Sequence, residues 1–414
     1  MGSYLAGYFK TNQQNGGVGV SLLPSGFRPT WLEIDLDSIV HNIQQFQRLL
    51  GPRVKIAAVV KADGYGHGAV EVSRAAVAAG ASYLMVAFLE EGVELRQAGI
   101  DAPILLLGYT DPAQVPALCR YNLIPSVFDL EVAHRMSAEL VRQGSELPVH
   151  IKVDTGMGRL GILPGGAAEF ITGVSRLPGL KLEGVYTHLA AADEEDPEFT
   201  ENQLQQFNRV IECCRNHGIS PSFYHAANSA AASAYPGSRF NLVRLGLSLY
   251  GYYPSVVLRG KNFISLKPAL SFKSRVVYLK EVPPGTAISY GCTHVASARS
   301  LIATVPVGYG DGYRWALSNR ARVLLRGRRV PVVGRVCMDH LMLDLTGVEG
   351  AQVGDEVVLY GRQGPAEVTL EEVAGWLGTL NYELLCAISR RVPRLYLRHG
   401  EPAAIRGSLG LKII

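Results

Sequence analysis

The stretch IAAVVKADGYGHG at residues 56–68 joins a short apolar run to a glycine-rich turn. The apolar run is typical of a buried strand, and three glycines within five residues after it predict a tight, open turn. Lys61 therefore ends a strand, with the phenol of Tyr65 four residues further on. An amine against apolar strand walls is costly to keep charged, so we expect its pKa to fall. A neutral amine is the form that condenses with an aldehyde. A solvated lysine after an edge strand is the alternative.

Short apolar runs alternate with helix-like segments from about residue 54 to residue 250. Two of the helix-like segments are Glu90–Gly99 and Phe199–Gly218, and the second begins with acidic residues and closes on a glycine. Eight such βα repeats predict a closed (β/α)8 barrel, with an open doubly wound sheet as the alternative. The expected strands are Ile56–Lys61, Tyr83–Phe88, Pro103–Gly108, Leu123–Phe128, Val149–Asp154, Leu182–His188, Tyr224–Asn228 and Leu242–Tyr250.

The pattern changes after residue 262, where strand-like segments follow one another without long helices. Turns such as Pro283-Pro284-Gly285 separate them, which predicts a mostly β second domain over residues 263–414. Residues 29–262 form the expected barrel domain, although the strand-like segment 31–36 is a candidate to pair with the second domain. The expected strands of the second domain are 270–279, 301–307, 322–325, 330–333, 341–345 and 356–359, with helices near 370–377 and 382–389.

Residues 1–28 are rich in Gly, Asn, Gln and Ser and lack both the basic start and the apolar core of a secretory signal. We interpret them as a flexible N-terminal extension. The six cysteines have no CxxC or zinc-like spacing. We therefore expect reduced thiols in a cytoplasmic protein, and no metal site.

The size and charge of the chain limit the classes of function. At 414 residues, of which 48% are hydrophobic, the chain is long enough for two domains with a large core. A net charge of +4 gives no reason to propose nucleic acid or an anionic membrane as a partner. No stretch approaches the ~20 continuous apolar residues that would span a bilayer.

Polar residues gather at the expected carboxyl ends of the barrel strands, where this kind of barrel builds its active site. Each residue alone has an ordinary structural explanation: His188 could be a core histidine, and Arg244 could belong to an internal ion pair. Their collection at one barrel mouth is much harder to attribute to chance. The set comprises Lys61, Lys152, Arg159, His188, Asn228, Ser229 and Arg244.

These residues belong to motifs that cover almost the whole chain after residue 30. The motifs are VVKADGYGHG at 59–68, TGMGRLG at 155–161, THLAAADE at 187–194, NS at 228–229, RLGLSLYG at 244–251, SYG at 289–291, VGYGDGY at 307–313 and GRVCMD at 334–339. In sequence and spacing they resemble the motifs of the alanine racemase family. The resemblance implies a barrel that binds pyridoxal 5'-phosphate and an enzyme that interconverts L- and D-alanine, supplying D-alanine for peptidoglycan.

In that family two bases act on opposite faces of the substrate α-carbon. The resemblance implies that Lys61 holds the cofactor through its amine and then serves as one base, and that Tyr290 of the SYG motif is the other. A tyrosine pKa is too high for a base at neutral pH unless cations stabilise the phenolate, and His188 and Arg159 are the candidates for those cations. The resemblance further implies a homodimer with shared active sites, in which Tyr290 approaches Lys61 of the partner chain.

The resemblance also assigns residues around the cofactor and the substrate. Arg244 is expected to donate to the pyridine nitrogen and keep it unprotonated, because a guanidinium is effectively never deprotonated. His188 is expected to pack on the cofactor ring and to link Arg244 to the rest of the network. The remaining cofactor-binding residues, mostly phosphate ligands, are Tyr65, Asn228, Ser229, Gly246, Leu247 and Tyr382. The expected substrate-binding residues are Arg159, Met338 and Tyr309.

Lys152 occupies the position at which part of the family carries a carbamylated lysine. Carbamylation would turn a cation into an anion able to orient Arg159, and an unmodified lysine facing a bound anion is the alternative. Asp63-Gly64, Gly310 and His340 depart from the residues common in the family, so the sequence defines the substrate less well than the reaction type.

Three other functions compete with this interpretation. A serine or broad-specificity racemase would act on a substrate that differs by one hydroxyl, which an apolar pocket rejects by ~100-fold at best. A barrel-type amino-acid decarboxylase would carry glycine-rich or paired-acid motifs that we do not find. A non-catalytic carrier of pyridoxal phosphate would resemble the barrel alone, whereas Tyr290 belongs to the second domain.

Overall fold

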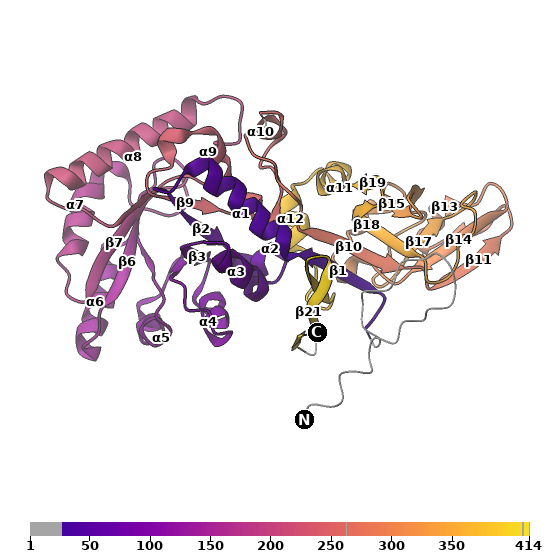
Figure 1. The fold of residues 1–414 in the computed structure, drawn as a ribbon, viewed down its shortest axis with the longest axis horizontal. Helices are drawn as coiled ribbons and strands as arrows, with labels where there is room; N and C mark the ends of the chain where they lie inside the picture. Colours follow the sequence, from indigo (N-terminus) through magenta and orange to yellow (C-terminus); the bar gives the residue numbers. More distant parts are fainter. Residues whose placement is uncertain (1–26, 262, 408–409, 414) are drawn as a thin grey trace. The chain divides into compact units, whose positions relative to one another are not determined.

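The structure is a computed structural model that describes residues 27–261, 263–407 and 410–413. Residues 1–26 of the expected N-terminal extension lie outside the described residues. The described chain forms two compact units (Figure 1). The barrel unit consists of residues 37–268, and the β unit consists of the described residues up to Leu36 together with those from Ala269 onward.

Parallel strands form the centre of the barrel unit. They make two four-stranded sheets, in the orders β4-β3-β2-β9 and β5-β6-β7-β8. A parallel bridge between Leu105 and Ile124 joins the sheets on one side. On the other side the backbone N–H of Arg244 donates to the carbonyl of Ala227 at 3.0 Å, so the strands close into a ring. The strands are β2(Lys55–Val59), β3(Tyr83–Val86), β4(Ile104–Leu106), β5(Ser126–Val127), β6(Leu147–Lys152), β7(Leu180–Tyr186), β8(Phe223–His225) and β9(Leu242–Leu245).

Helices connect the strands, and Figure 1 shows α4–α8 on the outside of them. In α6 the buried residues Ala133, Met136, Ser137 and Leu140 recur at helical spacing, so one face packs inward. Asp129 caps the start of this helix by accepting from the N–H of Val132. The helices are α1(Leu36–Leu50), α2(Lys61–Tyr65), α3(Ala69–Ala78), α4(Leu89–Gln97), α5(Val115–Tyr121), α6(Leu130–Gln143), α7(Pro164–Ser175), α8(Glu198–Asn216), α9(Ser229–Ala234) and α10(Val256–Gly260).

The β unit is built mainly from antiparallel strands. Its largest sheet has the order β16-β15-β18-β10-β1-β20-β21-β22, and β19 pairs with β18. The strands are β1(Thr30–Asp35), β10(Leu270–Arg275), β11(Tyr278–Val282), β12(Ala287–Ile288), β13(His294–Val295), β14(Ser300–Val305), β15(Arg322–Leu325), β16(Arg328–Pro331), β17(Leu341–Asp344), β18(Glu356–Gln363), β19(Ala366–Val368), β20(Arg394–Arg398), β21(Glu401–Gly407) and β22(Gly410–Ile413). Two helices, α11(Leu370–Leu377) and α12(Asn381–Cys386), complete it.

The expected fold class, an α/β domain of parallel strands followed by a mostly β domain, is confirmed. Strand β1 pairs with β10 and β20, so residues 30–35 belong to the β unit by their hydrogen bonds. The units divide at Pro268, shortly after the boundary expected at residue 262. Two hydrogen bonds between Asn42 and the backbone of Lys267 tie that connecting segment to α1.

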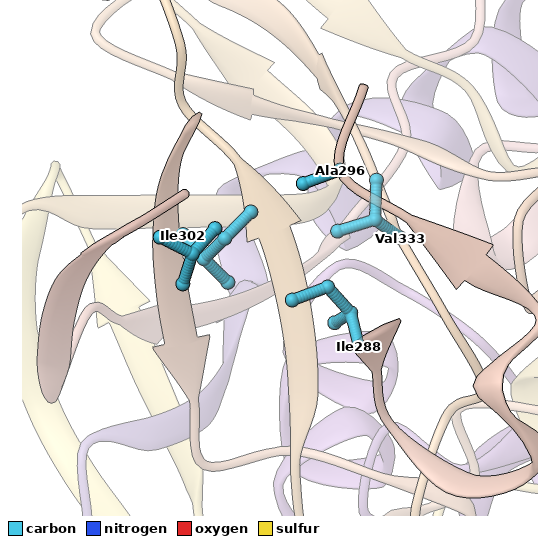
Figure 2. Close-up of a cluster of buried hydrophobic side chains, with 5 residues drawn as sticks. Ile288, Ala296, Ile302 and Val333 are labelled. Atoms are coloured by element: carbon cyan, nitrogen blue, oxygen red, sulfur yellow. The ribbon is translucent and has the colours of Figure 1, made fainter. Parts of the chain in front are cut away.

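One buried cluster of the β unit lies next to a candidate catalytic residue. Figure 2 shows Ile288, Ala296, Ile302 and Val333 packed together, and Val282 completes the cluster. Each of these side chains is at most 5% exposed. Ile288 lies two residues before the tyrosine of the SYG motif, so this core anchors one end of that loop.

None of the helices in the described part of the chain combines the length and the apolar character that crossing a bilayer would require.

Candidate active site

Lys61 follows β2, where the backbone makes a left-handed turn. Ala62, Asp63, Gly64 and Tyr65 have φ angles of 53°, 53°, 61° and 51°. A left-handed conformation costs an L-residue roughly 1–2 kcal/mol, and such strain persists only where surrounding contacts maintain it. The expected tight turn is present. Glycine accounts for only part of it, because three residues with a β-carbon adopt the same conformation.

Two carboxylates hold this turn in place. Glu91 in α4 accepts a hydrogen bond from the backbone N–H of Ala62 at 2.6 Å. Asp63 accepts one from the N–H of Ala69, at the start of α3, at 3.1 Å. The backbone that carries Lys61 is therefore tied to two neighbouring helices, while the lysine side chain is half-buried.

Arg244 lies in β9, the strand that pairs with β2, and only 3% of it is exposed. Its Nη1 lies 2.9 Å from Nδ1 of His225. Its Nη2 donates to the carbonyls of Thr187 at 2.8 Å and Ala226 at 2.7 Å. Burial lowers the pKa of Arg244 to about 10, so the guanidinium stays charged at neutral pH. Its partners come from the ends of two strands, which fixes the orientation of its plane.

His188 is in contact with this arginine. Nη2 of Arg244 lies 3.1 Å from Nδ1 of His188, and because a guanidinium only donates, this ring nitrogen accepts. Burial, followed by the charges of Arg244 and Arg159, lowers the pKa of His188 well below its usual value. The expected link between His188 and Arg244 is therefore present. The acceptor role of Nδ1 and the lowered pKa both speak against a charged His188, so its role as a cation beside the phenolate is not supported.

Ser229, Gly246 and Tyr65 come together beyond the ends of β8 and β9. The hydroxyl oxygen of Ser229 accepts from the backbone N–H of Gly246 at 3.0 Å and of Ser248 at 3.3 Å. A β-carbon at Gly246 would lie only 3.0 Å from the hydroxyl of Tyr65, so the absence of a side chain allows this approach. Leu247 then begins a short 3₁₀ helix, η3(Leu247–Tyr250). Hydroxyl and backbone N–H groups are thus concentrated at one place.

Asn228 acts as the N-terminal cap of α9. Its Oδ1 accepts from the N–H of Ala231 at 3.0 Å, and its Nδ2 donates to the carbonyl of Leu189 at 3.3 Å. Both contacts position the residue that follows, Ser229. A direct contact of Asn228 with a cofactor stays a prediction.

Lys152 ends β6 with 4% of its surface exposed. Burial, followed by the charges of Arg159 and Arg244, lowers the pKa of Lys152 to about 8. The charge of Lys61 acts in the same direction. A sizeable fraction of this amine is therefore neutral near physiological pH, which is the form that reacts as a nucleophile.

The loop that carries Arg159 is organised by Asp154. One carboxylate oxygen of Asp154 accepts from the backbone N–H groups of Gly156, Met157 and Gly158 at 2.7–3.1 Å, and the other accepts from the N–H of Arg159 at 3.0 Å. Burial alone would raise the pKa of Asp154, but these four hydrogen bonds lower it. Sequence reasoning had not assigned this role to Asp154. Four backbone N–H groups that donate to one carboxylate leave the TGMGR loop little freedom.

The sequence analysis also did not identify Tyr186 and His225 as residues of the site. Their rings stack in parallel, with centroids 4.7 Å apart and an interplanar angle of 3°. Cζ of Arg244 lies 5.5 Å from the centroid of the Tyr186 ring. Tyr186 precedes His188 by two residues, and two-residue spacing places side chains on one face of a strand. That alternation is the signal that could have identified Tyr186.

Four of the expected site residues belong to the β unit. Tyr290, Tyr309 and Met338 are strongly exposed, at 73%, 44% and 53%, and Tyr382 is partly exposed. The structure places these four residues in a different unit from Lys61.

The turn that carries Tyr290 is strained. Ser289 has φ 67° and ψ −178°, a region that favours glycine, and Cys292 has φ 50°. The hydroxyl of Ser289 donates to the carbonyl of Arg335 at 2.6 Å. That bond and the buried Ile288 hold the backbone on both sides of the tyrosine.

A buried carboxylate supports the VGYGDGY loop. Asp311 accepts from Arg28 at 2.6 and 3.0 Å, from Nε of Arg391 at 2.7 Å and from the N–H of Gly308 at 3.1 Å. Burial alone would raise the pKa of Asp311, but the hydrogen bonds from Arg28 and Arg391 lower it. Arg391 also donates to the carbonyl of Met338 at 3.4 Å. One carboxylate therefore links the loops that carry Tyr309 and Met338, a role that sequence reasoning missed.

The barrel residues fit a cofactor that carries both an aldehyde and a phosphate. Lys61 supplies an amine, and the groups around Ser229 and Gly246 supply donors for an anion. Arg159 adds positive charge nearby and is one of the charges that lower the pKa of Lys152. The carboxylate of Asp154 is engaged by backbone N–H groups, so an anionic ligand would balance this charge.

Comparisons with known proteins agree with this geometry. Residues 34–254 match the family described as alanine racemase, N-terminal domain, and residues 269–396 match the alanine racemase C-terminal domain. An alanine racemase from Halothermothrix orenii is 48% identical over 369 residues, which cover 89% of this chain and 97% of that protein.

Solved structures of similar proteins cover both units. The alanine racemase of Clostridium difficile 630 is 40% identical with a TM-score of 0.88, covering 92% of this chain and 99% of that one. A histidine racemase from Leuconostoc mesenteroides is 29% identical with a TM-score of 0.83, covering 90% of this chain and 99% of that one. The matched families span both units, and the relatives named here racemise amino acids. The chain therefore belongs to the alanine racemase family of amino-acid isomerases.

Proposed function

We propose that the chain interconverts L- and D-alanine with pyridoxal 5'-phosphate as cofactor and supplies D-alanine for peptidoglycan. The observation that carries the proposal is the convergence of Lys61, Arg244 and the Ser229–Gly246 donors on neighbouring strands of one barrel. An amine, a fixed cation and an anion-binding group are what this cofactor needs. When bound, the cofactor stabilises the negative charge left on the α-carbon after its proton leaves.

The barrel residues would bind and orient the cofactor. Lys61 would hold it covalently and, once free, accept or donate a proton at Nζ. Ser229, Tyr65 and the backbone of Gly246 and Leu247 would bind the phosphate, with Tyr382 as a further ligand. His188 would pack against the ring of the cofactor.

Arg244 would face the ring nitrogen. Because its guanidinium stays charged at neutral pH, it would donate a hydrogen bond without giving up a proton. An unprotonated ring withdraws electrons less strongly. By keeping the ring nitrogen unprotonated, Arg244 would therefore shorten the life of the negative charge at the α-carbon, which suits an enzyme that moves one proton.

Racemisation requires a second base on the opposite face of the substrate, and we propose that it is Tyr290 of the partner chain in a homodimer. Arg159 would stabilise the phenolate and bind the substrate, since the neutral ring of His188 supplies no charge. Met338 would receive the substrate carboxylate through its backbone, and Tyr309 would narrow the access to the site. The exposure of these three β-unit residues supports a role at an interface between chains.

We propose that Lys152 is carbamylated. Its amine is buried and has a lowered pKa, which favours the neutral form that attacks carbon dioxide. The carbamate would convert a cation into an anion beside Arg159 and so relieve the repulsion between them. A loss of about 44 Da from the intact mass on acidification is expected, and an unchanged mass would exclude the modification.

A racemase of another amino acid is the second candidate. It is favoured by one observation, the 29% identity to a histidine racemase of the same fold. Relatives with the same fold are named as racemases of different amino acids, so the fold alone does not determine the substrate.

The test is an isotope-exchange assay. The purified protein is incubated with pyridoxal phosphate and the L and D forms of alanine, serine and histidine in deuterium oxide. We expect optical rotation to decay and deuterium to enter at the α-carbon, fastest with alanine. Faster deuterium uptake with another amino acid would identify that amino acid as the substrate in place of alanine. Decarboxylation, or no deuterium uptake at all, would refute the proposed racemase activity.

We also propose a cytoplasmic location. All six cysteines lie in described parts of the chain and are free thiols, which are typical of a reducing compartment.

A further inference from the structure

Arg244 carries a buried positive charge, yet its hydrogen-bond partners carry no negative charge. Within the described residues they are the rings of His225 and His188 and the carbonyls of Thr187 and Ala226. A buried cation without a counter-anion is strongly unfavourable. The protein should therefore compensate the charge of Arg244 from further away.

A chain of hydrogen bonds leads from Arg244 to such an anion. Nη1 of Arg244 lies 2.9 Å from Nδ1 of His225. Nε2 of His225 lies 2.9 Å from Nδ1 of His150, and Nε2 of His150 lies 3.2 Å from a carboxylate oxygen of Glu183. The other oxygen of Glu183 accepts from the hydroxyl of Tyr83 at 2.8 Å. This Arg–His–His–Glu chain runs through the inside of the barrel.

The two ends of the chain fix its direction. A guanidinium can only donate, and a carboxylate can only accept. His225 and His150 must therefore each accept at Nδ1 and donate at Nε2, which makes both rings neutral with the proton on Nε2. Burial lowers the pKa of His150 and His225 and agrees with neutral rings. Burial alone would raise the pKa of Glu183, but hydrogen bonds from His150 and Tyr83 lower it, so the carboxylate stays ionised.

The strands provide space for the two rings. Gly184 pairs with His150 across β6 and β7, and a β-carbon at Gly184 would lie only 2.4 Å from Nδ1 of His150. The register of the two strands also shifts between Val149 and His150. The glycine and the irregular register allow the imidazole of His150 to lie across the neighbouring strand. Stacking on Tyr186 holds the second ring, that of His225.

We propose that Glu183 is the counter-anion of Arg244 and a positioning residue for it, acting through His150 and His225 from the opposite end of the barrel. Tyr83, the partner of Glu183, is the first residue of β3, whereas Arg244 contacts carbonyls beyond the ends of β7 and β8. Glu183 thus sets the proton positions of both imidazoles, and these hold the guanidinium in one orientation. The consequence for turnover rests on the proposed function.

The first test needs no substitution. In protein labelled with ¹⁵N-histidine, the ring nitrogens of His150 and His225 should report an unprotonated Nδ1 and a protonated Nε2 in the neutral pH range. Assignment follows from the signals lost in His150→Asn and His225→Asn. A proton on Nδ1 of either ring, or a ring that becomes charged on mild acidification while the protein stays folded, would overturn the proposal. These signals do not depend on whether the protein racemises alanine, so the two proposals can fail separately.

The second test removes the anion. In Glu183→Leu we expect kcat for alanine to fall about ten- to a hundredfold with KM changed less than about threefold, because Arg244 loses its fixed orientation. The pH dependence of the visible absorbance of the bound cofactor should shift as well. Glu183→Gln keeps an acceptor for His150 but removes the negative charge, so it should restore only part of the lost kcat. Full recovery in Glu183→Gln would show that Arg244 needs no counter-anion at this position.

The control is Glu146→Gln, an exposed glutamate that pairs with Lys181 at the start of the same strands. It should leave kcat and the cofactor spectrum unchanged. If Glu183→Leu does not fold, Tyr83→Phe removes one of the two bonds to Glu183 and should give a smaller change of the same kind. Unchanged kcat and an unchanged spectrum in the folded Glu183 variants would show that Glu183 supports the fold alone.

Discussion

The barrel unit and the β unit present their candidate site residues in opposite ways. In the barrel unit Arg244 and Lys152 are buried, and the loops around them are fixed by carboxylates and backbone groups. In the β unit Tyr290, Tyr309 and Met338 are exposed, although their loops are equally well held. The barrel unit thus gathers most of the groups proposed to bind the cofactor, whereas the β unit presents these three side chains to solvent. The difference supports the proposal that these side chains act at an interface between two chains.

The largest expected effect is the loss of racemisation when the amine of Lys61, in the barrel unit, is removed. Lys61→Ala should reduce racemisation by about 10⁴-fold or more, because both the covalent attachment and one base are lost. The cofactor should then leave on dialysis, as measured by visible absorbance. The matched control is Lys261→Ala, an exposed lysine after α10, which should behave as the parent protein. Retained activity in Lys61→Ala would refute the assignment of the base.

The next effect tests how rigidly the β unit holds its exposed residues. Asp311→Asn should destabilise the protein by about 3 kcal/mol near neutral pH, because two arginines lose their buried anion. The pKa of Asp311 is depressed in the folded state, so its contribution is present above the pKa of the unfolded chain and is lost as pH falls through the folded pKa. The difference in unfolding free energy between parent and variant should therefore shrink in acid. A difference that is independent of pH would contradict this account.

A smaller effect is expected from the strained turn of the barrel unit. Glu91→Ala removes the acceptor for the N–H of Ala62 and should destabilise the protein by about 2 kcal/mol. The affinity for pyridoxal phosphate should fall as well, because Lys61 is carried by this turn. Glu90→Ala, at the exposed neighbouring position, is the control and should change neither quantity. Equal effects of the two substitutions on cofactor titration would contradict a specific role for Glu91.

The smallest effect concerns pH. The pKa of Lys152 is lowered to about 8 by burial and by Arg159 and Arg244, so between pH 8 and its unfolded value the folded chain binds fewer protons than the unfolded chain. Stability should rise with pH in that window, by up to about 1 kcal/mol per pH unit. Lys152→Met in carbon dioxide-free buffer should lack this rise. The same slope in parent and variant would assign it to other groups.

The sequence predicted the features of the two units that depend on local residue pattern. Buried β-branched runs identified the barrel strands, and the glycines after Lys61 identified the turn. What it did not predict depends on contacts between distant segments. Asp311 pairs with Arg28 and Arg391, and these three residues lie in three separate parts of the sequence. The residues next to Asp311 in the sequence do not indicate that it is buried. The lowered pKa of His188 likewise follows from burial and from the charge of Arg244, which no motif encodes.

Strand ends were also predicted less well than strand centres. The segment 242–250 was expected to be one strand, but β9 ends at Leu245, where Gly246 redirects the chain into η3. Because Gly246 approaches Tyr65 closely, this early end is part of the proposed phosphate site.

The most direct test of the account is a mixed dimer. Differently tagged Lys61→Ala and Tyr290→Phe chains are co-expressed, and the heterodimer is isolated by two affinity steps. If each site combines Lys61 of one chain with Tyr290 of its partner, the heterodimer should contain one intact site and show about half the activity of the parent dimer, although both homodimers are inactive. A confirmed heterodimer without activity would contradict shared sites and place both bases in the same chain.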